Sequence, residues 1–213
     1  DLVYGRPATS GEHELRVAYP FYSFFLFLPF SLIENYSTAR ALWMVFLEIL
    51  LIFSTIITIK VVNWRPKFLM LFLIMVFSIF WYHGLRAIIN GNAVVVILFF
   101  CILCIYAIIN KQDEIAGICL AIMTIKPQVV LAVIVFISLW SILNHRRKIF
   151  FWFLGTVTVF ILLGLFFLPN WPIEFLREVL RYPSYNPPGT PASSLSELLP
   201  GAGRQLGLIL SGI

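Results

Sequence analysis

The sequence predicts an all-α membrane protein, a polytopic transmembrane helix bundle of about six spans with an interfacial or re-entrant helix on its outer face. Hydrophobic residues make up 61% of the 213 residues and charged residues only 12%, and the mean hydropathy is +0.95. An ordinary soluble domain is about half apolar and about a quarter charged. Several apolar stretches approach or exceed the roughly 17–25 residues that a helix needs to cross a bilayer. They lack the alternating pattern of barrel strands, so we expect the spans to be helical.

Residues 1–37 are expected to form an outer loop with one membrane-associated helix. Residues 1–17 are polar and rich in helix breakers. Residues 19–33 are apolar and aromatic, but they carry Pro20 and Pro29. This segment is either an interfacial or re-entrant helix or a seventh span. Its length of about 15 residues and its two prolines favour a helix on the outer face.

Residues 38–168 are expected to form the transmembrane bundle. Long apolar runs predict clear spans at 38–60, 68–83, 93–110 and 149–168. Between the last two lies a pair of arms, 114–126 and 128–144, of which the first is short. The bundle therefore has about six crossings if each arm of the pair crosses once.

Residues 169–213 are expected to form a second outer loop and the start of a further apolar segment. The loop is polar and rich in Pro, Gly and Ser, and its run WPIEFLREVLRY predicts a surface helix. Because the chain opens on Asp1 and stops inside an apolar run, we expect it to be an internal fragment of a longer protein.

Basic residues predict the topology of the bundle. They gather in three short loops, which contain Lys60, Arg65 and Lys67, then Lys111, and then Arg146, Arg147 and Lys148. If the six segments each cross once, the three loops share one side, which the positive-inside tendency makes cytoplasmic. The outer side then receives residues 1–37, a loop at 83–92, the turn at Lys126 and the tail after Pro169. The net charge of +5 and the pI near 9.3 therefore indicate topology rather than nucleic-acid binding.

Lys126 is the charged residue that most strongly predicts function. It is the only charged residue in the stretch 115–144, and Pro127 and Gln128 follow it in a tight turn. An ammonium group is expensive inside a bilayer, so we expect Lys126 to hold something anionic. Arg40 and Arg86 also lie at outer ends of spans, near the level of a lipid phosphate.

Three cations from three helices can converge on one phosphate or diphosphate group. The alternative is that each side chain extends to the lipid headgroups, which is common at helix ends. For Arg40, extension to the headgroups is favoured. For Arg86, which follows His83 by one turn and precedes the polar Asn90-Gly91-Asn92 turn, phosphate binding and extension to the headgroups are equally favoured. For Lys126, binding of an anionic group is favoured.

The remaining polar residues of the bundle carry weaker signals. Glu48 lies near the middle of a span, where a structural hydrogen bond is favoured over a proton relay because no second intramembrane acid accompanies it. Cys101, Cys104 and Cys119 lie in apolar helices and are expected to be core residues. The three His residues, 13, 83 and 145, show no metal-ligand spacing, so no metal site is expected.

Five runs of sequence together resemble a known family. They are YGRPATSGEHELRVAYPFYSFFLFLPFSLI, ARALW, LRAIINGNAVVVILFF, AGICLAIMTIKPQVVL and RYPSYNPPGTP. In this order they resemble glycosyltransferase family 87, a group of C-type (GT-C) membrane glycosyltransferases. The most specific pieces are the AYP-F-Y run at Pro20 and the I-K-P-Q turn at Lys126. The chain has Gly91-Asn92 where the family commonly has Gly-Gln, which leaves the contact made by this loop open.

The resemblance implies a hexosyltransferase or pentosyltransferase of a prokaryotic-type plasma membrane. Such an enzyme moves a sugar from a polyprenyl-phosphate donor to a hydroxyl of a lipid or glycan acceptor on the outer face, with inversion. Lys126 and Arg86 are then expected to stabilise the departing lipid phosphate. Residues expected to contact the donor phosphate or sugar are Arg40, His83, Asn92 and Gln128.

The resemblance implies a carboxylate as the general base near the end of a first transmembrane helix, which we expect upstream of this fragment. Within the chain, its weak candidates are Asp1, Glu12 and Glu14. The resemblance implies a polyprenyl-phosphate sugar as donor substrate and makes no cofactor certain, and it leaves any metal requirement, the sugar and the acceptor open.

A transporter or lipid flippase is the competing class. It also needs cations near the outer leaflet and a broken helix pair around its site. Transporters often show two related halves, and the sequence contains no internal repeat, which favours the enzyme. A non-catalytic membrane scaffold is the third possibility, and it predicts that replacement of Lys126 has no effect.

Overall fold

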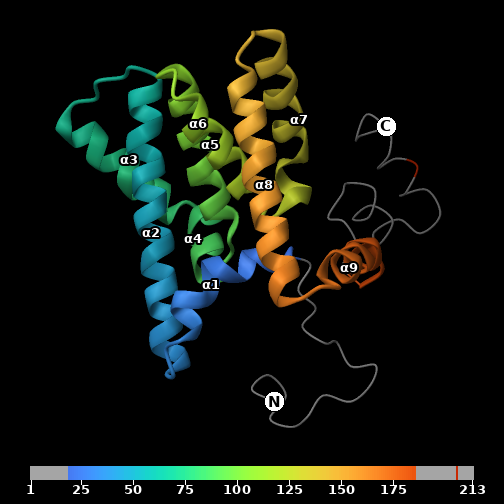
Figure 1. Cartoon of the computed structure of the whole chain (residues 1–213). Coiled ribbons are helices and arrows are strands. Elements are labelled where there is room, and N and C mark those ends of the chain that lie inside the picture. Colours follow the sequence, from blue (N-terminus) through green and yellow to red (C-terminus); the bar gives the residue numbers. More distant parts are fainter. Residues whose placement is uncertain (1–18, 186–204, 206–213) are drawn as a thin grey trace. The chain divides into compact units, whose positions relative to one another are not determined.

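The computed structural model describes residues 19–185 and Gln205, and every regular element in that part of the chain is a helix (Figure 1). Residues 19–169 form one compact unit, and the C-terminal helix α9 (Trp171–Tyr185) belongs to another. The predictions made for residues 1–17, and with them the candidate bases Asp1, Glu12 and Glu14, lie outside the described residues. The predicted all-α class is confirmed for the described part.

The compact unit contains one 3-10 helix and eight α-helices among the described residues. In chain order these are η1 (Phe21–Ser23), α1 (Phe24–Ser31), α2 (Tyr36–Val61), α3 (Phe68–Phe80), α4 (Tyr82–Ile89), α5 (Val94–Ile109), α6 (Asp113–Met123), α7 (Pro127–Leu143) and α8 (Arg147–Phe167). Asn35 caps α2 by accepting a hydrogen bond from the Thr38 backbone N–H at 2.9 Å. Pro127 begins α7, where its fixed φ suits the first helical position.

The helices differ in length more than the sequence predicts. Helices α2 and α8, of 26 and 21 residues, are long and apolar enough to cross a membrane, and α3 with α4 forms a third candidate that bends by 51°. Helices α5 and α7 are shorter apolar helices, and α6 has only 11 residues. The described part therefore supports two or three spans by length and composition, and six full spans are not established.

The chain breaks between α3 and α4 at Trp81, whose backbone is extended with ψ of 140°. A span was expected over 68–83, followed by a loop over 83–92. That expectation was wrong, because residues 82–89 form α4 and the turn is confined to residues 90–92.

Four helices of the unit end in the same kind of turn. A residue with positive φ follows each of α2, α4, α5 and α7, and these residues are Asn63, Gly91, Lys111 and His145. The next backbone N–H then donates to the carbonyl five residues earlier, at 2.8–3.1 Å. This is the Schellman motif, which satisfies the last carbonyl groups of a helix. Each of these four helices therefore ends at a defined residue.

The three basic loops lie at one end of the unit, as the sequence predicts. Arg146, before α8, forms an ion pair with Asp113 at the start of α6 and donates to the Ile108 carbonyl near the end of α5 at 2.8 Å. Residues of the α2–α3 loop line a common pocket with Tyr106 and Asn110 of the α5 end. The turn at Lys126 and the start of α2 lie at the other ends of these helices (Figure 1).

The core consists of two clusters of buried side chains. One joins α5, α6, α7 and α8 and includes Cys104 and Cys119, while Cys101 packs against it. The prediction that the cysteines are core residues is confirmed. Helix α6 lies between α5 and α8, and its Gly117 allows the α8 backbone to come close. The second cluster joins α2, α4 and α5 around Trp43 and Leu47, with α1 packed on it.

Helices η1 and α1 connect two parts of the bundle end that lies opposite the basic loops. The rings of Phe27 and Phe30 in α1 each lie 5.0 Å from the Trp43 ring of α2. Tyr22 in η1 is bonded to Thr124 in the α6–α7 turn. The two helices together cover 11 residues, a rise of about 16 Å, which is about half of the hydrocarbon layer. This length supports an interfacial or re-entrant helix rather than a seventh span.

Candidate functional site

The turn between α4 and α5, residues 90–92, is bound by side chains from two other parts of the chain. The Trp43 indole nitrogen donates to the Gly91 carbonyl at 3.0 Å, and the Arg40 guanidinium donates to the Ile89 carbonyl at 3.3 Å. Gly91 has φ of +59°, and a Cβ on it would lie 3.2 Å from the Trp43 indole nitrogen. A glycine is therefore favoured at this position both by backbone conformation and by the close approach of the ring.

Lys126, which lies 34 residues after Asn92 in the sequence, contacts the same turn. Its Nζ donates to the Asn92 Oδ1 at 3.3 Å, and that oxygen also accepts from the Val94 backbone N–H at 3.1 Å. The ammonium group lies over the Tyr19 ring, 5.7 Å from its centroid, within the range of a cation–π interaction. Asn92 and Tyr19 thus fix the direction of the Lys126 side chain.

The Lys126 side chain is half-buried, in the turn between α6 and α7 and outside both helices. Burial lowers the pKa of Lys126 below its ordinary value because desolvation disfavours the charged form. The ion pairs among the described residues are Arg146–Asp113 and Lys148–Glu114, so none of them neutralises Lys126. A positive charge is therefore held near a backbone turn without a carboxylate from the described part of the chain.

Tyr22 holds the other side of the Lys126 turn. Its hydroxyl lies 2.8 Å from the Thr124 Oγ1 and donates to the Thr124 carbonyl at 3.1 Å. The side chain is buried, and this burial raises the pKa of Tyr22, so the phenol stays neutral. The run that contains Tyr19 and Tyr22 and the turn that contains Lys126 are 102 residues apart in sequence, yet they form one site.

The Lys126 turn lies deeper in the bundle than the sequence suggests. It was expected at the end of a full span, level with the lipid phosphates. Helix α6 rises only about 16 Å from the basic end, and Trp43, which contacts the neighbouring turn, is the eighth residue of α2. Seven residues of α2 therefore extend about 10 Å past this level, so the candidate site is recessed within the bundle.

Comparison with known protein families assigns the chain to one of them. The model of glycosyltransferase family 87 matches residues 18–206, which is most of the chain. The chain belongs to this family. No curated protein and no solved structure gives a significant match to it. The family 87 match includes every described residue of the site, and the chain is accordingly a membrane glycosyltransferase.

The other candidate residues of this family 87 chain are distributed around the same end. The Arg86 guanidinium donates to the Tyr82 hydroxyl, one turn earlier in α4, and also lies over the Tyr82 ring. The His83 ring packs on Trp81 and Tyr82. In the described contacts, neither Arg86 nor His83 joins Lys126.

Arg40, Gln128 and Glu48 have different surroundings. Arg40 is exposed, and among the described residues its link to the site is the hydrogen bond to the Ile89 carbonyl. Gln128 is exposed in the first turn of α7, two residues from Lys126. Glu48 is partly buried in α2. The expected convergence of Arg40, Arg86 and Lys126 on one point remains a prediction.

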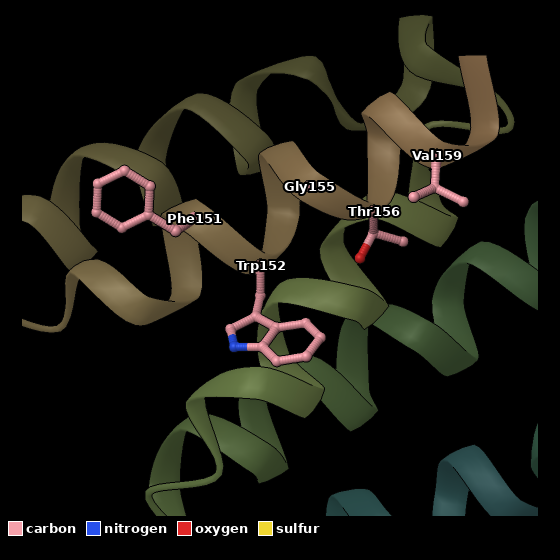
Figure 2. Close-up of a pocket in the computed structure, with 5 residues that line it drawn as sticks. All are labelled: Phe151, Trp152, Gly155, Thr156 and Val159. Atoms are coloured by element: carbon pink, nitrogen blue, oxygen red, sulfur yellow. The ribbon is translucent and has the colours of Figure 1, made fainter. Parts of the chain in front are cut away.

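Two apolar pockets lie along the sides of the helices. One, of about 470 Å³, is formed by α2, α3, α4 and α5, and His83, Gly84, Val94 and Val95 are among the residues that line it. The other, of about 460 Å³, lies on α8 where Gly155 leaves a gap between larger side chains (Figure 2). Its lining of Phe151, Trp152, Gly155, Thr156 and Val159 offers no acid or base. Because their linings are mainly apolar, both pockets are better suited to bind hydrocarbon chains than to hold the reacting groups.

Four site residues were not identified from the sequence as functional. Trp43, Tyr19, Tyr22 and Thr124 contribute through contacts that join distant segments. Trp and Tyr near span ends usually lie at the membrane interface, so their presence in the sequence does not by itself indicate a site. The signal that pointed to Tyr19 and Tyr22 was the AYP-F-Y run, one of the two most specific pieces of the resemblance.

Proposed function

We propose that this glycosyltransferase moves a sugar from a polyprenyl-phosphate donor to an acceptor hydroxyl on the outer face of the membrane, with inversion. The observation that carries the proposal is the ammonium group of Lys126, held by Asn92 and Tyr19 in a recessed turn. A charge of this kind is costly within a membrane, and an anionic ligand offsets that cost. The phosphate of a lipid-linked donor is such a ligand.

The proposed step is a single displacement at the anomeric carbon. The acceptor oxygen attacks this carbon, the bond from the carbon to the donor phosphate oxygen breaks, and the electron pair leaves with the lipid phosphate. A carboxylate outside the described residues takes the hydroxyl proton. Negative charge grows on the departing phosphate oxygen, and Lys126 lowers the barrier by binding that charge more strongly in the transition state than in the ground state.

The surroundings of Lys126 support this role. Asn92 and Tyr19 hold the ammonium group before the donor arrives, so little reorganisation is needed when charge develops. Val94, which lines the apolar pocket that includes His83, is two residues from Asn92 in the sequence. A prenyl chain in that pocket would place its phosphate toward the polar turn, where Arg40 and Gln128 supply further donors.

Replacement of Lys126 tests the proposal directly. Membranes that contain Lys126→Ala are incubated with a labelled polyprenyl-phosphate sugar, and label in the acceptor fraction is measured. Loss of one electrostatic donor of this type lowers turnover by about 10²–10³-fold. Lys126→Arg keeps the charge but changes the geometry, so it should retain part of the activity.

Lys148→Ala provides the matched control for this experiment. It removes a lysine from the basic end of the bundle, where Lys148 is exposed and lies 3.5 Å from Glu114. The control should transfer sugar at the normal rate. Full activity of a folded Lys126→Ala protein would contradict the proposed role, and transfer without any polyprenyl-phosphate sugar would contradict the proposed donor.

A further inference from the structure

A polar pocket lies at the end of the bundle that carries the basic loops, away from the Lys126 turn. It has a volume of about 460 Å³ and is formed by the end of α2, the loop that follows it and the end of α5. Its polar and aromatic lining consists of Lys60, Asn63, Trp64, Arg65, Tyr106 and Asn110. The combination of two cations, amide groups and two aromatic rings is unlike the apolar lining of the pockets on α8 and around His83.

The two cations of this pocket differ from other basic residues at the same end. Arg146 is paired with Asp113, and Lys148 lies near Glu114. Among the described residues, neither Lys60 nor Arg65 takes part in an ion pair. The pocket thus holds two positive charges that the described carboxylates do not neutralise, and an anionic ligand would lower their mutual repulsion.

The backbone fixes the shape of this pocket. Asn63 has φ of 52°, and the Schellman turn places the Trp64 N–H at 3.1 Å from the Ile59 carbonyl and the Asn63 N–H at 3.1 Å from the Lys60 carbonyl. On the α5 side, the Asn110 amide donates to the Tyr106 carbonyl at 2.8 Å. Both walls are therefore held by hydrogen bonds, and the pocket exists before a ligand binds.

The pocket also carries apolar surface beside its charges. Val61 and Ile109 line it, and the Trp64 side chain is half exposed at its edge. Trp and Tyr side chains prefer the headgroup level of a bilayer, where one end of the ring is wet and the other apolar. Two cations at this level match a phosphate group, and the apolar rim matches the glycerol and first methylene groups attached to it.

We propose that this pocket binds the headgroup phosphate of an anionic phospholipid in the leaflet at the basic end of the bundle. By the positive-inside tendency this leaflet is the cytoplasmic one, where anionic lipids attract basic residues near helix ends. Lys60 and Arg65 bind the phosphate oxygens, and Trp64 packs on the glycerol region. The site is separate from the proposed sugar-transfer site, because α2 and α5 run from one to the other.

The test measures lipid binding by the purified protein in phosphatidylcholine nanodiscs. Phosphatidylglycerol is titrated into the discs, and bound lipid is counted by native mass spectrometry. The variants are Lys60→Gln and Arg65→Gln, and Lys67→Gln is the control because it removes the same charge from the same loop without lining the pocket. Each pocket variant should weaken binding about five-fold, whereas the control should change it less than two-fold.

Two results would overturn the proposal. An equal loss in Lys67→Gln would show that the loop attracts anionic lipid by its overall charge rather than through a pocket. Binding of soluble glycerol phosphate as tight as that of phosphatidylglycerol would show that the ligand is a free phosphate compound and not a lipid. The three side chains are exposed, so the variants are expected to fold, and equal melting temperatures verify this.

Discussion

Replacement of Gly117 by alanine tests the packing that positions the Lys126 turn. A Cβ at Gly117 in α6 would lie 2.6 Å from the Ile149 carbonyl oxygen, 2.6 Å from the Trp152 Cβ and 2.9 Å from the Phe153 backbone nitrogen. All three atoms belong to α8 and lie on or next to its backbone, so no rotamer change removes the clash. To reach an ordinary contact of 3.4 Å from 2.6 Å, α6 and α8 must separate by about 0.8 Å.

The expected cost follows from two opposing terms. Overpacking of this kind destabilises a core by about 1–3 kcal/mol, and a clash with backbone belongs to the upper part of that range. Alanine gains about 1 kcal/mol over glycine in a helix interior. The net loss is therefore about 1–2 kcal/mol, which lowers the melting temperature of a protein of this size by roughly 2–8 °C.

Gly155→Ala is the matched control, because no atom lies within 4 Å of the Cβ that it would add to α8. It should leave the melting temperature unchanged or raise it. Melting is followed by intrinsic fluorescence in detergent, and sugar transfer is measured below the transition. Since α6 leads directly to Lys126, Gly117→Ala should also lower transfer, because a shift near 1 Å can cost up to about 100-fold. A Gly117→Ala protein that melts at or above the wild-type temperature would refute the reasoning.

Two further predictions concern charged groups. The transfer rate should fall as pH rises through the pKa of Lys126, because only the protonated ammonium carries charge. Burial lowers this pKa from its ordinary value of 10.5, so the fall should begin at a lower pH than for a lysine in water. Lys126→Arg should abolish this fall in rate at high pH, because a guanidinium stays protonated. If the variant has the same pH profile as the unmodified protein, the role of Lys126 is contradicted. Separately, Asp113→Asn should destabilise the protein by roughly 1.5–3 kcal/mol, since it breaks the partly buried pair with Arg146. Glu114→Gln should cost about 0.5 kcal/mol or less, because its pair with Lys148 is exposed; equal melting temperatures of the two variants would disprove this difference.

The sequence predicted the helices where long apolar runs decide the structure. The expected span at 38–60 is α2, the span at 93–110 is α5, and the arms at 114–126 and 128–144 are α6 and α7. Hydrophobicity gives the position of such helices because the membrane requires it. The common end of the three basic loops was predicted for a similar reason, since charge patterning follows membrane topology.

The break at Trp81 was not predictable from hydrophobicity, because the residues on both sides of it are apolar. The depth of Lys126 was missed because the prediction treated every segment as a full crossing, whereas α6 has 11 residues. The site contacts of Tyr22 with Thr124 and of Trp43 with Gly91 join residues 102 and 48 positions apart. A single sequence carries no information on such pairings beyond the chemistry of the partners.

The recess of the Lys126 turn has a consequence for side reactions of the proposed enzyme. An activated sugar phosphate is open to hydrolysis whenever water reaches its anomeric carbon. The Lys126 turn lies about 10 Å inside the start of α2, and the buried Tyr22 contacts it through Thr124. In the proposed reaction, the short length of α6 would therefore keep the donor away from the bundle surface and would favour attack by the incoming hydroxyl over hydrolysis.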